Sequence, residues 1–299
     1  MSGPLRISTF SRTSIMLAAQ YRGFLDAVGL TVQIEPVTGS RQQMADLIAG
    51  RHDIAHTNAD NIMRYRAAGH PELYVFLVLD RGIAQKLVVA PQVSGWADLR
   101  GATVGVDAPD SGYAFVLYEL LRRHGIEPGQ YNVRALGATG LRLAALRRGE
   151  VAAAMLSHHH EASALDGGFR VLAASNDHFA DLPGMTAATT RSWAGQHKRV
   201  LSDYTAALVD AAAWAIRPEN HEDVVRLVAD ASGLAPAQAR RLLDIETGSR
   251  TGVVTTVADA AESLARTAAL RRQYTGAEPS GYFDPSVLAA AFERRSADR

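Results

Sequence analysis

"MADLIAGRHDIAHTNADN" at residues 44–61 has a counterpart further along the chain, "RLAALRRGEVAAAMLSHHH" at residues 142–160. Each stretch indicates a helix that ends at a glycine and is followed by a short apolar strand, with Leu47 and Gly50 matching Leu146 and Gly149. One such helix–strand unit in each half of the chain predicts two lobes built on the same plan. The polar segments that follow the two strands would then occupy comparable positions.

Strand-like runs alternate with helical patterns through the first 190 residues. The series begins with "LRISTF" at 5–10, a helix near 14–27, "LTVQIEPV" at 30–37 and a helix near 40–49. Such alternation is typical of parallel βαβ units. After about residue 190 the pattern becomes mostly helical. A length of 299 residues exceeds one typical domain, so we expect a two-lobed α/β protein.

Charge and composition narrow the class of partner. Lys plus Arg and Asp plus Glu both number 31, and no basic stripe interleaves with aromatic residues, so neither nucleic acid nor an anionic membrane surface is expected. No stretch approaches the roughly 18 apolar residues of a membrane span. The absence of cysteine excludes thiol nucleophiles, disulfides and Cys-ligated metal centres. We therefore expect a small-molecule ligand, no cofactor, and a monomer.

Polar residues follow the first and third predicted strands. In open parallel sheets, ligands collect beyond the carboxyl ends of the strands. After the first strand, hydroxyls and an aromatic side chain are available from Thr9, Phe10 and Ser11. After the strand near 56, the candidates are His56, Thr57, Asn58 and Asn61. Ordinary helix capping by Asn58 or Asp60 explains part of this second group without a ligand.

The segment "DSGYAFVLYELLRRHG" at 110–125 predicts a helix capped by Asp110 or Ser111, opened by Gly112 and Tyr113 and closed by Gly125. Free N–H groups and the positive end of the helix dipole suit a carboxylate, sulfonate or nitrate oxygen. The alternative is a capped helix with no ligand. The segment lacks the glycine patterns of nucleotide-binding loops, which excludes a nucleotide here.

The run "MLSHHHEAS" at 155–163 adds three candidates for ligand contact, Ser157, His158 and His160. An extended His158-x-His160 would place two rings on one face, and His56 with Glu161 or Asp60 would complete a metal site. No His-Glu-x-x-His or similar signature accompanies them. We therefore expect these histidines to contact a ligand directly, without a metal.

Several longer segments together resemble the nitrate, sulfonate and thiamine-precursor branch of periplasmic binding-protein-like folds (NMT1/THI5-like). The segments are "GFLDAVGLTVQIEPV" (23–37), "LIAGRHDIAH" (47–56), "ADLRGATVGVDAPDSGYAFVLYELLRRHGIEP" (97–128), "LRRGEVAAAML" (146–156) and "VLSDYTAALVDAAAWAIRPEN" (200–220). Their order is that of the family, and the similarity runs from about residue 5 to 230. "DLRG-x-x-VGV" and "GEV" are fairly specific only in combination.

The resemblance implies a type 2 periplasmic-binding-protein fold, with lobe 1 formed by residues 1–88 and 188–299 and lobe 2 by 89–187. Segments 80–91 and 183–191 are the linker candidates and would form the hinge. In such proteins the polar segments named above line a cleft between the lobes. The resemblance thus implies a ligand site formed by Thr9, Phe10, Ser11, His56, Thr57, Asn58, Asn61, Ser111, Gly112, Tyr113, Ser157, His158 and His160.

The function favoured by the resemblance is a solute-binding protein that encloses a small anionic or aromatic molecule and delivers it to an ABC permease if the chain is exported. As it stands, the chain shows no signal peptide, so we expect it in the cytoplasm, or in the periplasm or lipid-anchored if an export segment has been removed. A ligand-sensing module that works through a partner protein is a further, less favoured class.

An enzyme on the same scaffold, a lyase or hydrolase with His56 as general acid or base, is the main alternative. An aromatic sulfinate desulfinase with this fold has a histidine and an arginine ten residues apart, similar to His56 and Arg66. Its nucleophilic cysteine corresponds to Phe10, so desulfination is not expected. In an uninterrupted helix Arg66 would also lie about 15 Å along the axis from His56.

Overall fold

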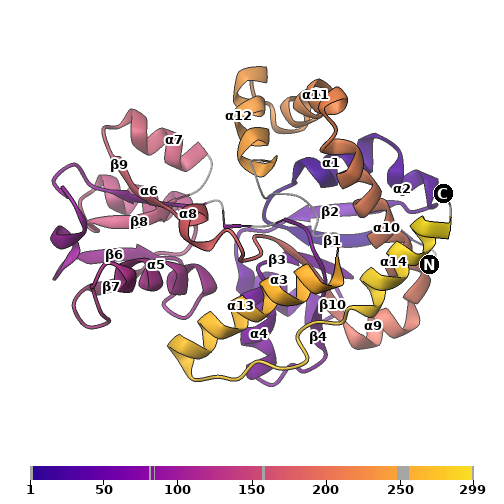
Figure 1. The fold of residues 1–299 in the computed structure, drawn as a ribbon, viewed down its shortest axis with the longest axis horizontal. Helices are drawn as coiled ribbons and strands as arrows, with labels where there is room; N and C mark the ends of the chain where they lie inside the picture. The colour runs from indigo at the N-terminus through magenta and orange to yellow at the C-terminus, as the bar shows by residue number, and fades with distance from the viewer. Residues whose placement is uncertain (1–2, 81, 84, 157–158, 248–255, 298–299) are drawn as a thin grey trace. The chain divides into compact units, whose positions relative to one another are not determined.

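The computed structural model describes residues 3–80, 82–83, 85–156, 159–247 and 256–297, and it divides into two compact units (Figure 1). Unit 1 consists of Met1–Arg81, Asp181–Arg266 and Pro279–Arg299, and unit 2 of Gly82–Ala180 and Thr267–Glu278. The unit boundaries differ from those of the expected lobes, because residues 82–88 belong to unit 2 and residues 181–187 to unit 1. A segment near the C-terminus, Thr267–Glu278, also belongs to unit 2.

A five-stranded mixed sheet with the order β2-β1-β3-β10-β4 forms the centre of unit 1. Its strands are β1 (Leu5–Thr9), β2 (Val32–Pro36), β3 (Ile54–Thr57), β4 (Leu73–Val78) and β10 (Thr186–Thr190). β1 pairs in parallel with β2 and β3, whereas β10 runs antiparallel to β3 and β4. The carboxyl ends of β1, β3 and β4 therefore lie at the same edge of the sheet as the start of β10.

Helices cover both faces of this sheet (Figure 1). Right-handed crossovers place α1 (Ser14–Tyr21) and α2 (Phe24–Ala27) on one face and α3 (Ser40–Ile48) and α4 (Ala59–Ala67) on the other. The single helix expected near 14–27 is two helices, because Gly23 between them has a φ of 79°, in the left-handed region that glycine tolerates.

The mostly helical C-terminal part supplies an apolar layer on α1. Its elements are α9 (Arg191–Gln196), α10 (Lys198–Ala215), a 3-10 turn (Pro218–Asn220), α11 (His221–Ser232), α12 (Pro236–Thr247), α13 (Val257–Thr275) and α14 (Ser286–Ala297). Leu17 of α1 packs with Val224 and Val228 of α11 and with Leu243 of α12. This cluster, which also includes Ala215 of α10, shows that α10, α11 and α12 share a hydrophobic core with α1.

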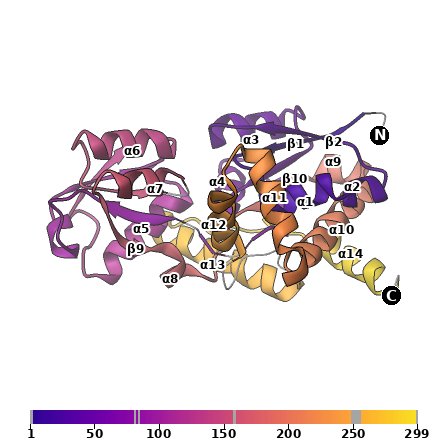
Figure 2. The ribbon, with the colours of Figure 1, turned by 90° about the horizontal axis from the view of Figure 1, so that it is seen from above.

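Unit 2 has a second five-stranded sheet, with the order β7-β6-β8-β5-β9. Its strands are β5 (Lys86–Val89), β6 (Thr103–Val106), β7 (Asn132–Ala135), β8 (Ala153–Leu156) and β9 (Arg170–Ala174). Its helices are a 3-10 turn (Trp96–Leu99), α5 (Gly112–Arg123), α6 (Thr139–Arg147), α7 (His159–Asp166) and α8 (Ser175–Phe179). Figure 2 shows α6 and α7 on one face of the sheet and α5 on the other. The predicted linkers 80–91 and 183–191 contain β5 and β10.

The internal repeat is confirmed element by element. Helices α3 and α6 each have nine residues, strands β3 and β8 each have four, and the spacing between helix and strand is the same. In unit 1 the side-chain nitrogen of Gln43 donates to the carbonyl of His56 at 3.0 Å. At the matching positions of unit 2, Arg142 Nε donates to the carbonyl of Met155 at 2.9 Å. Both units thus tie helix to strand at the same place.

The expected α/β fold class is confirmed, since each unit is a mixed sheet with helices on its faces. Among the residues that the structure describes, no helix is both long and apolar enough to cross a membrane.

Candidate functional site

In unit 1, the ends of β1 and β3 bring two buried threonines together. β1 ends at Thr9 and β3 at Thr57, and the two strands are neighbours in the sheet. The Thr9 hydroxyl donates to the carbonyl of Ser11 at 2.6 Å and lies 3.8 Å from the sulfur of Met185. This turn leaves Phe10 42% exposed and Ser11 exposed beside the buried Thr9. A large apolar side chain and a hydroxyl are therefore available to a ligand at this strand end.

The segment after β3 is ordered by its own amides. The Asn58 side chain caps α4 by accepting from the Asp60 N–H at 2.9 Å, and its amide nitrogen donates to the carbonyl of Gly184 at 3.4 Å. The Asn61 amide nitrogen donates to the Thr57 hydroxyl at 2.9 Å. Thr57 is buried, whereas Asn58 and Asn61 are half-buried. Local structure therefore positions the two half-buried amides, and solvent reaches them.

His56 corrects an expectation from the sequence, because its side chain does not face a strand-end site. The residue is completely buried, and its Nε2 shares a 2.9 Å hydrogen bond with the hydroxyl of Tyr204 on α10. Its Nδ1 lies 3.0 Å from the sulfur of Met16 on α1. Burial lowers the pKa of His56 to about 3 and raises that of Tyr204, so both groups are neutral at physiological pH. His56 is a core residue that links α1, β3 and α10.

Arg66 corrects the second catalytic expectation. Helix α4 is uninterrupted, and the guanidinium near its end donates to the carbonyls of Ser280 and Leu73, both at 2.7 Å, and to that of Pro71. Burial, followed by the charge of Arg191, lowers the pKa of Arg66. The arginine therefore fastens two backbone segments of unit 1, and the pairing of His56 with Arg66 is not formed.

In unit 2, the predicted cap of α5 is present. The Ser111 hydroxyl accepts from the Ala114 N–H at 3.0 Å and donates to a carboxylate oxygen of Asp107 at 2.5 Å. Ser111 is buried, while Gly112 and Tyr113 in the first helical turn are half-buried. The serine is thus committed to Asp107 and the helix, and the first turn of α5 is the part that a ligand can approach.

The sequence reasoning missed Arg142, which lies on α6, is only 3% exposed, and donates to β8. Besides its bond to Met155, its guanidinium donates to the carbonyl of Gly137 at 2.6 Å and to the Thr139 hydroxyl at 3.0 Å. Burial lowers its pKa, and the nearby Asp107 opposes this effect. Its match to the buried Gln43 in the internal repeat was the signal that could have identified it.

The structure describes part of the histidine run. Ser157 and His158 lie outside the described residues, and His160 is half-buried on α7. The His160 ring lies against the first turn of α6, since a Cβ built on Gly140 would be 3.2 Å from its Nε2. The neighbouring Glu161 pairs with Lys86 at 2.6 Å. Within the described ranges, no group of three or more His, Cys, Asp or Glu residues could hold a metal ion.

Each unit therefore presents polar groups where parallel strands end and helices begin. Unit 1 presents Phe10, Ser11, Asn58 and Asn61 beside the buried Thr9 and Thr57. Unit 2 presents the first turns of α5 and α6, with Ser111, Asp107 and Arg142 holding them in place. Such edges of α/β sheets offer helix N–H groups and hydroxyls to small ligands.

Solved structures share this fold, two of the three described here over nearly their whole length. The alkanesulfonate-binding protein SsuA from Xanthomonas axonopodis pv. citri, bound to MOPS, aligns with a TM-score of 0.75 at 21% identity, covering 96% of this chain and 97% of that chain. For DSZB in complex with biphenyl-2-sulfinic acid the values are 0.71, 15%, 97% and 99%. The nitrate-binding protein NrtA from Synechocystis PCC 6803 gives 0.66, 14%, 79% and 68%. At these identities the likeness concerns the fold, which is that of the periplasmic binding proteins.

None of the curated proteins matches the chain by sequence. A family model described as the NMT1-like family matches residues 7–229, from within β1 into α11. Because this match spans well over half of the sequence, the chain belongs to the NMT1-like family.

Proposed function

We propose that the chain is a solute-binding protein for a small anionic or aromatic molecule, with contacts drawn from the strand ends of both units. The observation that carries the proposal is the repeated arrangement of helix starts behind strand ends. Thr13, Asn58 and Ser111 cap α1, α4 and α5 directly after or close to β1, β3 and β6. Their first turns offer N–H groups and positive dipole ends, which favour an anion.

The accessible side chains of unit 1 support binding more than catalysis. Phe10, Ser11, Asn58 and Asn61 supply an apolar surface, a hydroxyl and two amides, none of which transfers protons readily near neutral pH. The two residues suggested for an enzyme, His56 and Arg66, are engaged within unit 1. Among the solved structures with this fold are sulfonate- and nitrate-binding proteins, which supports an oxyanion as the recognised group.

We infer closure on the ligand as a population shift, in which a ligand that contacts both units stabilises the closed form. If the chain is exported, an ABC import permease is the proposed partner and the periplasm its location. The ligand contacts proposed for unit 1 are Phe10, Ser11, Asn58 and Asn61, and for unit 2 they are Gly112, Tyr113, Ser157, His158 and His160.

A ligand panel of alkanesulfonates, carboxylates, nitrate and heterocycles tests the proposal, first by thermal shift and then by calorimetric titration. Asn61→Ala should weaken binding of a hit by about tenfold through loss of one amide contact. Arg64→Ala, further along the same helix, is the matched control and should leave affinity unchanged. The proposal fails if no member of the panel binds, or if a hit binds equally well to wild type and to a Ser11→Trp/Asn61→Ala double variant.

A further inference from the structure

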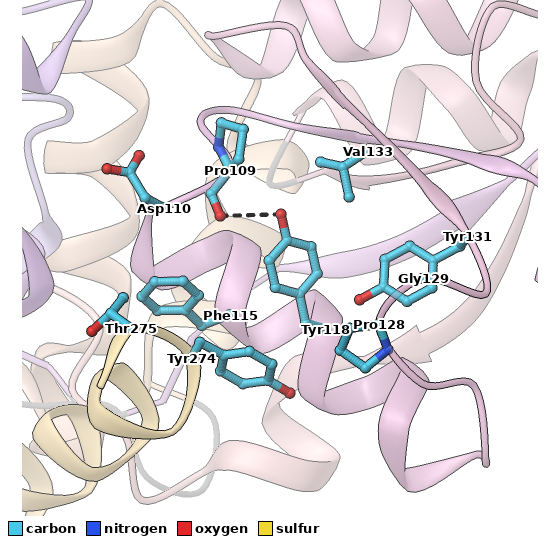
Figure 3. A pocket seen from close by; sticks show the side chains of 10 residues that line it. All are labelled: Pro109, Asp110, Phe115, Tyr118, Pro128, Gly129, Tyr131, Val133, Tyr274 and Thr275. Carbon is cyan, nitrogen blue, oxygen red and sulfur yellow. Dashed lines mark hydrogen bonds between the residues drawn. The ribbon is translucent and has the colours of Figure 1, made fainter. Parts of the chain in front are cut away.

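A hollow of about 310 Å³ lies on the side of unit 2 (Figure 3). None of the strand-end candidates lines it. Its walls come from the loop before α5, from α5 itself, from the start of β7 and from the end of α13. The lining residues are Pro109, Asp110, Phe115, Tyr118, Pro128, Gly129, Tyr131, Val133, Tyr274 and Thr275.

Four aromatic rings form a connected wall in this hollow. The Tyr118 ring lies 6.0 Å from that of Tyr131 and 5.7 Å from that of Tyr274, between ring centroids. Phe115 and Tyr274 stack at 5.4 Å with an interplanar angle of 8°. Tyr118 and Tyr131 are each only 8% exposed, so their positions are fixed by packing. The wall is therefore preformed and presents electron-rich ring surface to a guest.

The end of α13, which supplies Tyr274 to the hollow, is held against α5 by the carboxylate of Glu119. Glu119, the residue after Tyr118, accepts from the Tyr274 hydroxyl at 3.2 Å and from Gln273 at 2.9 Å. Arg122 and Arg123 also donate to Glu119, at 2.8 Å and 3.0 Å. These bonds hold the end of α13 against α5, so the side of the hollow formed by Tyr274 belongs to unit 2.

The polar groups in the hollow are mainly acceptors. The Tyr118 hydroxyl donates to the Pro109 carbonyl at 3.1 Å, which leaves lone pairs on both oxygens (Figure 3). The Tyr131 hydroxyl has no hydrogen-bond partner among the described residues. Asp110 also lines the hollow. A guest that donates hydrogen bonds or carries positive charge matches this set.

One end of the wall already has a cation. The guanidinium of Arg271 lies 5.6 Å from the Phe115 ring centroid, and Arg271 donates to the Asp110 carbonyl at 3.4 Å. A second cation beside Phe115 would be repelled. The available position is therefore the other end, between Tyr118, Tyr131 and Val133.

We propose that this hollow is a second binding site, distinct from the strand-end site, for a small amine that carries a ring. The ring would lie on Tyr118 and Tyr131, and the ammonium group would face ring surface and carbonyl oxygen, the environment that favours cations. A volume of about 310 Å³ is at the lower end of the range for small-molecule sites, so a single-ring guest fits. For a guest of that size we expect a dissociation constant of about a millimolar.

The probe is 2-phenylethylamine, which is titrated into the full chain while the NMR chemical shifts of the protein are recorded. Neutral 2-phenylethanol and anionic phenylacetate have nearly the same shape and are the matched probes. Saturable shifts at the lining residues are expected for the amine, with phenylacetate at least about tenfold weaker because the acceptors repel it. The proposal is overturned if the amine produces no saturable shifts there, or if phenylacetate binds as tightly as the amine.

A pair of variants at Val133 separates charge from shape. Val133 is 39% exposed on β7, a strand whose four residues are all exposed, so substitutions there should preserve folding. Val133→Lys should weaken amine binding by about tenfold, whereas Val133→Met, of similar length, should stay within about twofold of wild type. Equal weakening by both variants would contradict the electrostatic argument. Because no strand-end residue is involved, these outcomes are independent of the proposed function.

Discussion

Replacing His56 by glutamine should remove a specific part of the acid sensitivity of unit 1. His56 is completely buried, and burial lowers its pKa from 6.5 to about 3. In the unfolded chain the imidazole takes up a proton near pH 6.5, whereas in the folded protein it resists protonation down to about pH 3. The contribution of neutral His56 to the free energy of unfolding is therefore fully present above pH 6.5 and is lost as the pH falls from 6.5 toward 3.

Each pH unit in that window costs about 1.4 kcal/mol of unfolding free energy for one proton taken up by the unfolded state. Between pH 6.5 and pH 4.5 the contribution of His56 is thus about 3 kcal/mol. Glutamine keeps an amide next to Tyr204 but does not titrate. The variant should be less stable than wild type at pH 7.5, and its stability should fall less by about 3 kcal/mol over the same pH range.

The assay is urea unfolding at several pH values in a Trp96→Phe background. Trp96 is the single tryptophan of unit 2, so the remaining fluorescence reports on Trp193 and Trp214 in unit 1. His221→Gln, at a half-buried position on α11, is the control and should keep the wild-type pH dependence. The reasoning is refuted if His56→Gln loses as much stability with acid as wild type, or if NMR shows His56 titrating near pH 6.5.

The remaining predictions concern packing and buried polar contacts. Arg142→Met should destabilise unit 2 by about 3 kcal/mol, because it removes a buried hydrogen bond to the Met155 carbonyl and a partly buried one to the Gly137 carbonyl. Gln43→Met should likewise destabilise unit 1 through loss of the bond to the His56 carbonyl. Urea unfolding measures both changes, and equal stability of wild type and variants would contradict the shared role. Leu17→Ala should cost about 3 kcal/mol through a cavity between α1 and α11, whereas Ile216→Ala, 61% exposed, should cost less than about 0.5 kcal/mol; similar losses would argue against the packing. Glu119→Gln should lower the unfolding free energy of unit 2 by about 2 kcal/mol at pH 7, because Arg122 holds the pKa of Glu119 at about 2. The loss should shrink as the pH falls below 4.5. If wild type and variant differ in stability at pH 3 as much as at pH 7, the ion-pair contribution is refuted.

The fold could be predicted from the sequence because its signals are local and repeated. The pattern of a helix, a glycine and an apolar strand at 44–57 and 143–156 predicted two matching α–β units, and both are present, with helices and strands of equal length in the two units. Of the two linker candidates, 80–91 contains the boundary between the units, which lies before Gly82, and 183–191 begins just after the second boundary at Asp181. Each candidate also contains a strand, Lys86–Val89 or Thr186–Thr190, whose partners lie far away in sequence, so a local pattern could not give the pairing.

The candidate site was predicted less well, because side-chain direction depends on tertiary packing. Thr9, Asn58 and Ser111 do stand at strand ends or helix caps, positions that their residue types indicate. Side chains along β3 point alternately to the two faces of the sheet, and the sequence does not show which face packs against α10. The His56 ring faces the core because it pairs with Tyr204 of α10, which lies far away in sequence. The aromatic hollow of unit 2 likewise depends on Tyr274, which no pattern links to α5.

Recovery of the ligand tests the central claim most directly. The chain is incubated for many hours with one equivalent of a molecule that the panel identifies, and then denatured, and the released molecule is quantified by NMR and mass spectrometry. A solute-binding protein returns one equivalent of the unchanged molecule. Release of a chemically altered product, absent from a boiled-protein control, would contradict the account and favour an enzyme on this fold.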